Sequence, residues 1–505
     1  MSSHDSESKA RSGGPTHATR DTSHDRERLT SIARRAMLER NLEPDFPPAA
    51  LKELTRLHAP AVAEEGLRDL RELLWAAIDN DDSRDIDQLT VAESEGGGRV
   101  RVRVAIADVD ALVRKGSALD LHAAANTTSV YTPAVVFPML PAALSTDLTS
   151  LNQDGDRLAL VVDMLFDAQA TLLESDIYRA RVRNRAQLAY PSMAVWLEGH
   201  AQAPARVREV AGLAENLRLQ DQLAQRLVES RHRNGALDFE TLETRAVFQG
   251  EGISSLELDR KNRAKQLIED FMIAANGVGA KFLAAKKFPS IRRVLRSPER
   301  WDRIVAFAAS FGSKLPGEPD AVALEAFLLQ RRKAEPEKFA DLSLVVIKLI
   351  GRGEYALDLP GDEAPGHFGL AVKDYTHSTA PNRRYPDLIT QRLLKAAIAG
   401  APPPYALEEL GQLAKHCTDQ EDAATKVERS VRKSAAALLL SDRLGASFDA
   451  VVSGASMSGT WVRLCTIPVE GRVEQGFQGL DVGDRVRVKL VHTDVERGFI
   501  DFVRV

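Results

Sequence analysis

Five aspartates lie within nine residues, in the segment from Asp79 to Asp87. Carboxylates at this spacing repel one another unless positive charge lies among them. Their oxygens are hard ligands of the kind that Mg²⁺ and Mn²⁺ prefer. The apolar residues Trp75–Ile78 and Leu89–Val91 flank the segment and indicate that the carboxylates lie at the edge of a hydrophobic core. The segment therefore predicts a site for hard divalent cations.

Two other structures have to be considered for this cluster. An EF-hand loop starting at Asp79 is excluded, because its sixth position would be Arg84 instead of glycine and its twelfth Thr90 instead of glutamate. A solvated acidic turn is the usual role of a run of charges, and composition alone favours it as much as a metal site. The apolar flanks favour the metal site. Covalent catalysis has no support, because the sequence contains neither G-x-S-x-G nor H-E-x-x-H.

The elements that must position these aspartates begin with strands. Residues 89–93 and 99–107 are rich in β-branched side chains, and arginine and valine alternate from Arg99 to Val104. The turn residues Glu95–Gly98 lie between them, so the pattern predicts a β-hairpin. Leu158–Phe166 predicts a further strand.

Helical patterns dominate later in the chain. Residues 205–231 predict one long amphipathic helix, because apolar side chains recur at helical spacing on one face. Further helices are expected over residues 261–286, 299–312, 319–333, 338–351, 385–399 and 406–445. Strands followed by helices predict an α+β fold, with an antiparallel sheet and surrounding helices.

The C-terminal residues return to short strand patterns. Five are expected, over residues 448–452, 459–464, 471–473, 485–491 and 499–503. Their number and length suit a small OB-type β-barrel.

The N-terminal residues predict no β-structure. Residues 1–24 contain almost no bulky apolar side chain and predict a disordered tail. Residues 25–70 predict two or three short helices, which form either a helix-turn-helix-like module or a packing appendage. The expected domains are therefore the tail at 1–24, the helical module at 25–70, a large mixed domain at 71–444 and the barrel at 445–505.

Composition restricts the function further. A net charge of −5 over 505 residues argues against a polybasic nucleic-acid binder but allows a local basic groove. Two distant cysteines, Cys417 and Cys465, argue against a disulfide framework and a structural zinc site. No window of 18 apolar residues predicts a membrane span, and no hydrophobic leader is evident. We expect a cytoplasmic, reducing compartment.

Ordered sequence blocks continue from the aspartates along most of the chain. They are Ala105–Val109, Gly116–Asp120, Thr128–Tyr131, Pro138–Pro141, Leu144–Ser145, Ser150–Asn152, Gly235–Phe239, Ile268–Asn276, His367–Ala371 and Tyr375–Leu388. Over residues 74–398 this series resembles the RNB catalytic domain of the RNase II family of exoribonucleases. The C-terminal barrel resembles the S1 RNA-binding domain that follows the catalytic domain in that family.

The resemblance implies Mg²⁺-dependent hydrolysis of single-stranded RNA from its 3′ end, without sequence preference and with release of nucleoside 5′-monophosphates. Two metal ions would be held by Asp79, Asp85 and Asp87, with Mn²⁺ as a possible substitute for Mg²⁺ and no other cofactor. Asp87 is the residue whose loss should stop the chemistry. Gln88 stands where the family commonly has a fourth aspartate, and its neutral amide oxygen can ligate a metal without adding charge.

The same resemblance assigns roles around the RNA. Arg383 would bind the phosphate as a bidentate fork and offset charge in the transition state. Arg384 would contact the RNA backbone or support the fold. Glu269, in preference to its neighbour Asp270, would lie near the terminal nucleotide, although helix N-terminal carboxylates are equally common without a ligand.

Aromatic residues complete the expected RNA site. Tyr131 and Phe239 match positions where rings stack on bases, and stacking tolerates any base. Without the resemblance, both would more often be core residues. His377 is expected to be a hydrogen-bonded structural histidine.

Two features depart from the family. Its members commonly carry two cold-shock barrels before the catalytic domain, whereas the residues before Asp79 predict only helices, so digestion of structured RNA is expected to differ. Gln88 is the one hint of an RNA-binding protein with reduced or lost catalysis. A nuclease that cuts internally or acts on another nucleic acid is a third possibility, but the presence of Asp79, Asp85, Asp87 and Arg383 favours the exonuclease.

Overall fold

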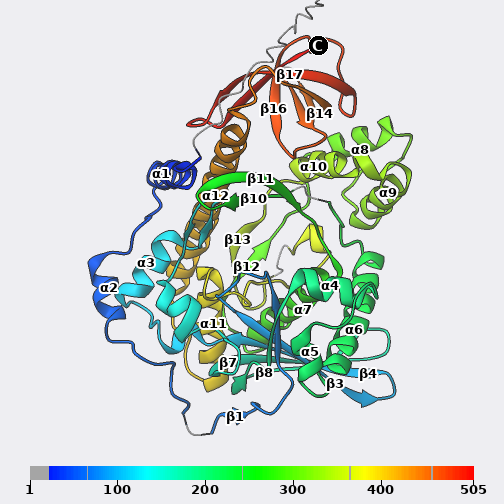
Figure 1. The fold of residues 1–505 in the computed structure, drawn as a ribbon. Coiled ribbons are helices and arrows are strands. Elements are labelled where there is room, and N and C mark those ends of the chain that lie inside the picture. Colours follow the sequence, from blue (N-terminus) through cyan, green and yellow to red (C-terminus); the bar gives the residue numbers. More distant parts are fainter. Residues whose placement is uncertain (1–21, 65, 241–242, 363–365, 457–458) are drawn as a thin grey trace, which may run out of the picture. The chain divides into compact units, whose positions relative to one another are not determined.

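The computed structural model describes residues 22–64, 66–240, 243–362, 366–456 and 459–505 (Figure 1). All but the last three residues of the predicted tail at 1–24 lie outside the described residues. The chain divides into two compact units. One comprises residues 34–243 and 259–428, and the other comprises residues 1–33, 244–258 and 429–505.

A seven-stranded sheet lies at the centre of the first unit, with the strand order β1-β8-β7-β4-β3-β2-β9. The inner pairs are antiparallel, and the two outer pairs, β1 with β8 and β2 with β9, are parallel. The strands are β1 (Arg68–Asp69), β2 (Ala76–Asp79), β3 (Gln88–Gly96), β4 (Arg99–Ala107), β7 (Asp156–Phe166), β8 (Leu172–Arg183) and β9 (Ala186–Ala189). The predicted hairpin is confirmed, since β3 and β4 pair directly and Val100, Val102 and Val104 face the core.

Helices of the same unit pack on this sheet and on one another. The helix α6 (Leu213–Arg233) contacts both β3 and α7 (Arg263–Ala285). The other helices are α2 (Pro48–Leu54), α3 (Ala118–Asn126), α4 (Tyr190–Leu197), α5 (Ala205–Glu209), α8 (Trp301–Ser310), α9 (Ala321–Ala334), α10 (Phe339–Ile350) and α11 (Tyr385–Ala399). The α+β expectation is confirmed.

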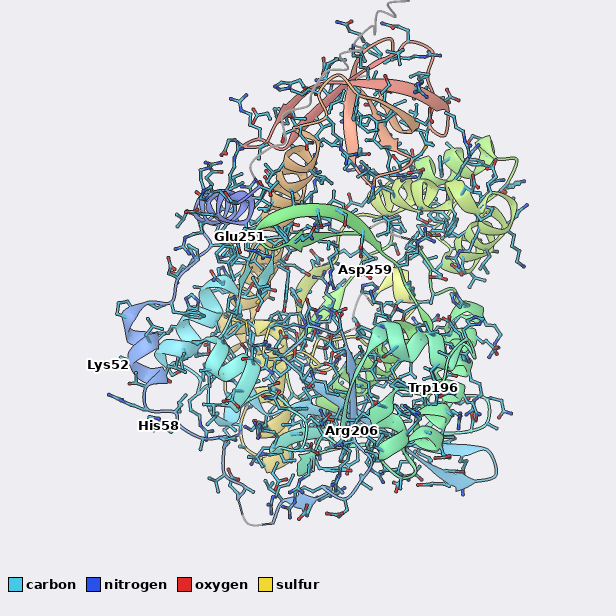
Figure 2. All side chains as sticks on the ribbon, viewed as in Figure 1. Lys52, His58, Trp196, Arg206, Glu251 and Asp259 are labelled. Atoms are coloured by element: carbon cyan, nitrogen blue, oxygen red, sulfur yellow. The ribbon has the colours of Figure 1, made fainter. Side chains whose placement is uncertain are left out.

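The single helix predicted over residues 205–231 is wrong. The chain leaves the helix at Val210, which is extended, and α6 begins only after Gly212, whose φ of 79° favours glycine. The short helix α5 carries Arg206 (Figure 2). The Nε of Arg206 donates a hydrogen bond of 2.9 Å to the carbonyl of Arg185, which fixes α5 separately. Apolar spacing continued across the break and hid it.

Several short elements complete this unit. A two-stranded sheet joins β5 (Val130–Tyr131) to β6 (Val136–Phe137), and another joins β12 (Ser290–Val294) to β13 (Glu354–Asp358). A π-helix, η2 (Leu144–Leu148), and the 3₁₀ helices η1 (Val109–Ala111), η3 (Pro336–Lys338) and η4 (Phe368–Leu370) connect longer elements. π-helical turns often occur at functional sites.

The second unit contains the predicted C-terminal barrel, which is confirmed as a closed five-stranded barrel with the order β14-β15-β16-β18-β17. Its strands are β14 (Ser447–Ser456), β15 (Gly459–Leu464), β16 (Glu470–Gln475), β17 (Arg485–Asp494) and β18 (Phe499–Arg504). The hairpin of β10 (Glu243–Gln249) and β11 (Gly252–Asp259) belongs mainly to this unit, where Asp25 Oδ2 accepts a 3.1 Å hydrogen bond from the amide of Ile253.

Two helices continue from one unit into the other. One is α1 (Asp25–Leu38), and the other is α12 (Leu407–Leu440), which ends before the predicted residue 445. Turns follow it, and Gly445 in the second of them has a φ of 85°. Nine residues separate α1 from α2, whereas a helix-turn-helix motif has a turn of three to four residues. Within the described ranges, no helix combines the length and the apolar composition needed to cross a bilayer.

Candidate active site

The aspartate segment forms the loop between β2 and β3, at one edge of the central sheet. Asp79 is the last residue of β2 and pairs with Ala189 of β9. Gln88 is the first residue of β3 and pairs with Ile106 of β4. The amide of Ala107 donates to the carbonyl of Asp87 at 2.9 Å, which fixes the end of the loop against β4.

Asp87 is the most enclosed carboxylate of this loop, with 2% of its surface exposed. Its Oδ1 accepts a hydrogen bond of 2.9 Å from the amide of Asn382. Its Oδ2 is buried without a hydrogen-bond partner, and the nearest cation is Arg383 Nε at 3.5 Å. Burial raises the pKa of Asp87 to about 7, against the opposing effects of Arg383 and the Asn382 amide. A carboxylate held this way accommodates a cation at Oδ2.

Asp85 and Tyr131 lie beside each other, since the Tyr131 hydroxyl donates to Asp85 Oδ2 at 3.3 Å. Asp79 Oδ1 accepts hydrogen bonds from the Asn80 amide and the Ser83 hydroxyl, at 2.7 and 3.0 Å. Burial raises the pKa of Asp79. Arg383 and Asp85 are close enough to influence this pKa, and both also influence that of Asp87. The structure therefore brings together Asp79, Asp85, Asp87, Arg383 and Tyr131.

The donors of this loop fit a hard divalent cation. Asp87 offers a buried oxygen without a donor, and both hydrogen bonds of Asp79 use only one of its two oxygens. Among the described residues, no three His, Cys, Asp or Glu side chains are gathered closely enough to form a metal centre by themselves. Asp81 and Asp82, which the same loop carries, are exposed. A ligand role for Gln88 stays a prediction.

The segment after η2 holds the aspartate loop in place. The Ser150 hydroxyl accepts a hydrogen bond from the Ile86 amide at 2.9 Å and lies 2.8 Å from the Arg84 carbonyl. The Leu151 amide donates to the Ile86 carbonyl at 2.9 Å. No role was predicted for these residues from the sequence, although the block Ser150–Asn152 was part of the resemblance.

Arg384 turns away from the aspartates and into the fold. Its guanidinium donates to Asp387 Oδ1 at 2.8 Å, and Asp387 is fully buried. Its backbone pairs with Thr128, while the carbonyl of Arg383 accepts from the amide of Ser129 at 3.0 Å. These contacts support the fold around Arg383, and contact of Arg384 with RNA stays a prediction.

Histidines and tyrosines pack beside the turn at residues 380–384 that carries Arg383 and Arg384, which we call the arginine turn. His377 Nδ1 lies 2.8 Å from the Tyr355 hydroxyl, and its ring also meets Tyr375 edge to face. Tyr375 meets His367 in the same way. The structural role expected for His377 agrees with these contacts.

These histidines predict sensitivity to acid. Burial and nearby arginines lower the pKa of His367 to about 4 and that of His377 well below its usual value. As the pH falls from 6.5 towards 4, the unfolded chain therefore takes up protons that the folded chain does not, and stability falls by up to about 1.4 kcal/mol per pH unit for each histidine. Denaturant unfolding at pH 7 and pH 5 should show a smaller decline for His377→Gln than for the wild type. An equal decline would contradict this assignment.

The structure does not place Phe239 or Glu269 beside the aspartates. Phe239 packs against the hydrophobic cluster of α8, α9 and α10, which includes Trp301 and Phe339. Glu269 lies on α7, where Lys261 Nζ is 3.0 Å from its carboxylate. The neighbouring Asp270 is buried and paired with Arg231. The RNA contacts expected of Phe239 and Glu269 stay predictions.

The basic run that begins at Arg292 supplies no surplus charge for an RNA path. Arg292 is buried and donates to Asp358 at 2.9 Å. Arg293 pairs with Glu421, and Arg296 Nε donates to Glu354 at 2.7 Å. The cations are evident in the sequence, whereas the carboxylates that neutralise them come from distant segments.

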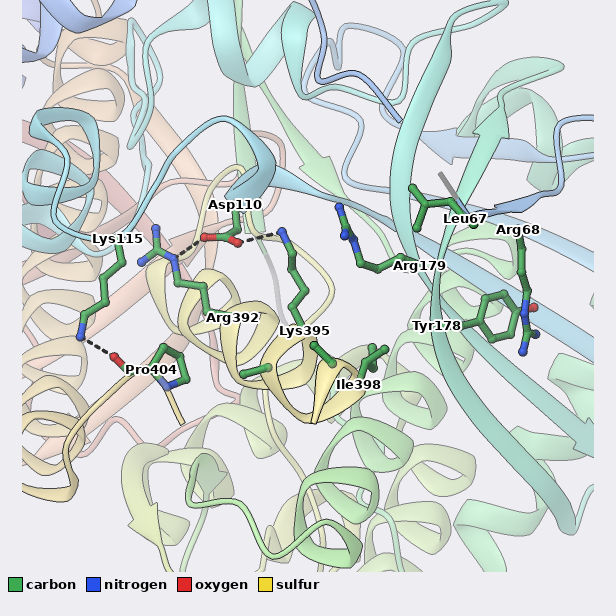
Figure 3. A pocket seen from close by; sticks show the side chains of 13 residues that line it. Leu67, Arg68, Asp110, Lys115, Tyr178, Arg179, Arg392, Lys395, Ile398 and Pro404 are labelled. Atoms are coloured by element: carbon green, nitrogen blue, oxygen red, sulfur yellow. Dashed lines mark hydrogen bonds and ion pairs between the residues drawn. The ribbon is translucent and has the colours of Figure 1, made fainter. Parts of the chain in front are cut away.

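A cavity of about 580 Å³ lies beside α11 (Figure 3). Its lining includes Arg68, Asp110, Lys115, Tyr178, Arg179, Arg392 and Lys395. Lys395 Nζ bonds both Asp108 and Asp110 at 2.7 Å, and Arg392 Nε donates to Asp110 at 2.9 Å. Arg179 likewise pairs with Asp108 at 3.3 Å. These cations are already neutralised, so the cavity offers little attraction to a phosphate.

Comparison with known families decides the affiliation of the fold. Residues 67–400 match the model of the RNB domain, which is more than half of the chain. This chain belongs to the RNB family. Residues 446–505 match the C-terminal S1 domain of RNase II-type exonucleases, in the region of the β-barrel.

Similar proteins extend this finding. Ribonuclease R of Vibrio parahaemolyticus is 30% identical to this chain over 496 residues. The match covers 91% of this chain and 58% of that protein. The chain thus spans less than two thirds of the length of this curated relative.

Solved structures show the same fold. RNase R of Mycoplasma genitalium, in complex with ribose methylated single-stranded RNA, superposes with a TM-score of 0.84 and 22% identity, over 95% of this chain and 78% of that one. Yeast Ssd1, described as a pseudonuclease, superposes with a TM-score of 0.68 and 17% identity, over 91% of this chain and 56% of that one. The RNB fold thus occurs in a protein described as a nuclease and in one described as a pseudonuclease, so activity must be argued from the site.

Proposed function

We propose that this chain is a 3′→5′ exoribonuclease that hydrolyses single-stranded RNA without sequence preference and releases nucleoside 5′-monophosphates. The observation that carries the proposal is the enclosed Asp87 carboxylate, with an oxygen free of hydrogen bonds and Arg383 Nε 3.5 Å away. The RNB affiliation and the Ribonuclease R relatives support the same activity.

The side chains divide the work of hydrolysis. Asp79, Asp85 and Asp87 would hold divalent cations, for which we propose Mg²⁺ with Mn²⁺ as a substitute, and Gln88 would add a neutral ligand. Bound there, two such ions supply an activated water and stabilise the leaving 3′-oxygen. Arg383, which is 42% exposed, can present its guanidinium fork to the phosphate and offset charge in the transition state. The backbone amide of Asn382 keeps the Asp87 carboxylate oriented, because it donates a hydrogen bond to Oδ1.

Product analysis tests this proposal. A 5′-labelled single-stranded RNA incubated with Mg²⁺ should shorten stepwise from its 3′ end to a short labelled core, with 5′-monophosphates as the released product. DNA of the same sequence is the control for reading of the 2′-hydroxyl. Binding without shortening would reject the exonuclease, and internal fragments would indicate an endonuclease.

Tyr131 provides a test of base stacking, because 42% of its surface is exposed beside Asp85. Loss of one stacked base costs about 1–3 kcal/mol, so Tyr131→Ala is expected to raise the KM for RNA roughly tenfold. Tyr131→Phe keeps the ring and should stay within about twofold of the wild type. Phe239→Ala is the comparison, since its packing predicts a lower melting temperature. An unchanged KM for Tyr131→Ala would remove Tyr131 from the RNA site.

A second candidate is an RNA-binding RNB protein with reduced or lost catalysis, which Gln88 favours. Gln88→Asp adds a carboxylate to the site and should lower the Mg²⁺ concentration for half-maximal hydrolysis roughly tenfold, because ligand charge sets cation affinity. In EDTA the same change should lower the melting temperature through repulsion from the other aspartates. Gln88→Ala should raise the Mg²⁺ requirement. Activity that appears only in Gln88→Asp would support the second candidate.

We also propose single-stranded RNA as the partner and a cytoplasmic, reducing compartment, which the free cysteines Cys417 and Cys465 support. The division into a helical module at 25–70, a catalytic domain at 71–444 and an S1-like barrel at 445–505 is part of the same proposal.

A further inference from the structure

The segment Thr149–Leu151 contacts both parts of the chain that carry the proposed catalytic residues. Through Ser150 and Leu151 it bonds the aspartate loop at Ile86. Through Thr149 it reaches the arginine turn, since Thr149 Oγ1 lies 2.6 Å from Asn382 Oδ1. This last contact joins residues 233 positions apart in the sequence, and both of them are buried.

Asn382 connects this contact to the catalytic groups. Its backbone amide donates to Asp87 Oδ1 at 2.9 Å, and the next residue, Arg383, places Nε 3.5 Å from Asp87 Oδ2. Asn382 itself is completely buried. Any rotation of this turn would therefore change the separation of Asp87 and Arg383.

The side-chain amide of Asn382 can form the contact with Thr149 in either of its two orientations. The Thr149 hydroxyl also lies 2.8 Å from the Leu144 carbonyl, and one hydroxyl hydrogen cannot serve both acceptors. Meanwhile, Asn382 Nδ2 is buried without a partner. If the amide is turned by 180°, its NH₂ donates to Thr149 Oγ1 while the hydroxyl donates to Leu144. In both orientations the same two residues are joined.

We propose that the buried Thr149–Asn382 pair is a positioning lock, which holds the turn of Arg383 against the Asp87 carboxylate and so sets the rate of phosphodiester hydrolysis and not the affinity for RNA. This inference rests on the proposed exoribonuclease function. Thr149 and Asn382 are positioning residues, because they act through Asp87 and Arg383. Small displacements of catalytic groups reduce rates strongly, by about 100-fold for 1 Å in well-organised sites.

The test compares three matched substitutions. Thr149→Val keeps the shape but removes the hydroxyl, and Thr149→Ser keeps the hydroxyl. Thr90→Val is the control, because Thr90 is also fully buried and donates a 2.7 Å bond to a side-chain amide oxygen, that of Gln220. Each variant is assayed at the same number of degrees below its own melting temperature. Under these conditions Thr149→Val should lower kcat about tenfold or more and leave KM within twofold. Thr149→Ser and Thr90→Val should stay within about threefold of the wild-type kcat.

Hydrogen exchange of the metal-free protein provides a readout independent of activity. Thr149→Val should speed exchange of the backbone amides in residues 380–384 at least about tenfold. Without the Thr149 hydroxyl the turn is held less firmly, so the backbone amide of Asn382 leaves its acceptor, Asp87 Oδ1, more often. Thr90→Val and Thr149→Ser should not speed exchange there. Equal losses of kcat in Thr149→Val and Thr90→Val, or unchanged exchange in Thr149→Val, would overturn the lock. If the wild type hydrolyses no RNA with Mg²⁺ or Mn²⁺, the proposed function fails and the catalytic part of the inference fails with it, whereas unchanged exchange in an active protein refutes the lock alone.

Discussion

Asp87→Asn is expected to slow RNA hydrolysis by at least about 1,000-fold, the scale on which loss of a main transition-state contact acts. The amide has nearly the shape of the carboxylate, so its oxygen can still accept the hydrogen bond from the Asn382 amide. What it removes is the negative charge at Oδ2, the buried oxygen that lies near Arg383 without a donor. Single-turnover degradation of labelled RNA in saturating Mg²⁺ measures the loss.

RNA binding should survive the same substitution. Asp87 repels phosphate when it is ionised, so the Kd of Asp87→Asn for single-stranded RNA should equal that of the wild type or fall below it. Asp82→Asn is the matched control, because Asp82 lies exposed in the same loop. It should change the hydrolysis rate by less than twofold, as expected for an exposed charge. Retention of a tenth of the wild-type rate by Asp87→Asn would exclude Asp87 as the central catalytic carboxylate.

The parts of the fold that the sequence predicts are those with local patterns. The alternation from Arg99 to Val104 predicted β4. Each valine there is buried and pairs with a residue of β3, which a short glycine turn joins to β4. The strand β8 was not predicted, although its second half alternates in the same way, with Tyr178, Ala180 and Val182 buried between arginines. Its first half shows no such pattern, because residues 173–176 are all exposed. The partners of its charged residues come from distant parts of the chain, such as Asp108 for Arg179.

The same limit applies to the site. The aspartates predict a cation site together with the apolar residues that flank them. Their meeting with Arg383 has no local signal, because Asn382 and Asp87 are 295 positions apart. Only the family resemblance linked the two segments before the structure placed them together. Residue type alone also does not show which cations are neutralised, since Arg292 and Arg293 pair with carboxylates from β13 and α12.

Arg383→Ala is expected to reduce kcat about 100- to 1,000-fold, because it removes a cation from the position where charge accumulates on the phosphate. Arg383→Lys keeps the charge but loses the planar fork, so we expect an intermediate loss of roughly 30-fold. The melting temperature should change little in either variant, because the Arg383 side chain is 42% exposed and its ion pair with Asp87 is long, at 3.5 Å. Steady-state kinetics and thermal unfolding of the same samples measure both effects.

Arg384 is the matched comparison, since it is the next residue and carries the same side chain. Its guanidinium bonds the fully buried Asp387, and Asp387 Oδ1 also accepts from the amide of Ala380 at 2.8 Å. Removing one partner of a buried ion pair costs about 3–5 kcal/mol, so Arg384→Ala should lower the melting temperature strongly. A stable Arg384→Ala variant with a catalytic defect, or an unstable Arg383→Ala variant with normal kcat, would reverse the two roles. We expect a stable Arg383→Ala variant with a low kcat and an unstable Arg384→Ala variant. Of the two arginines, Arg383 reaches an aspartate of the catalytic loop, whereas Arg384 secures the turn that carries Arg383.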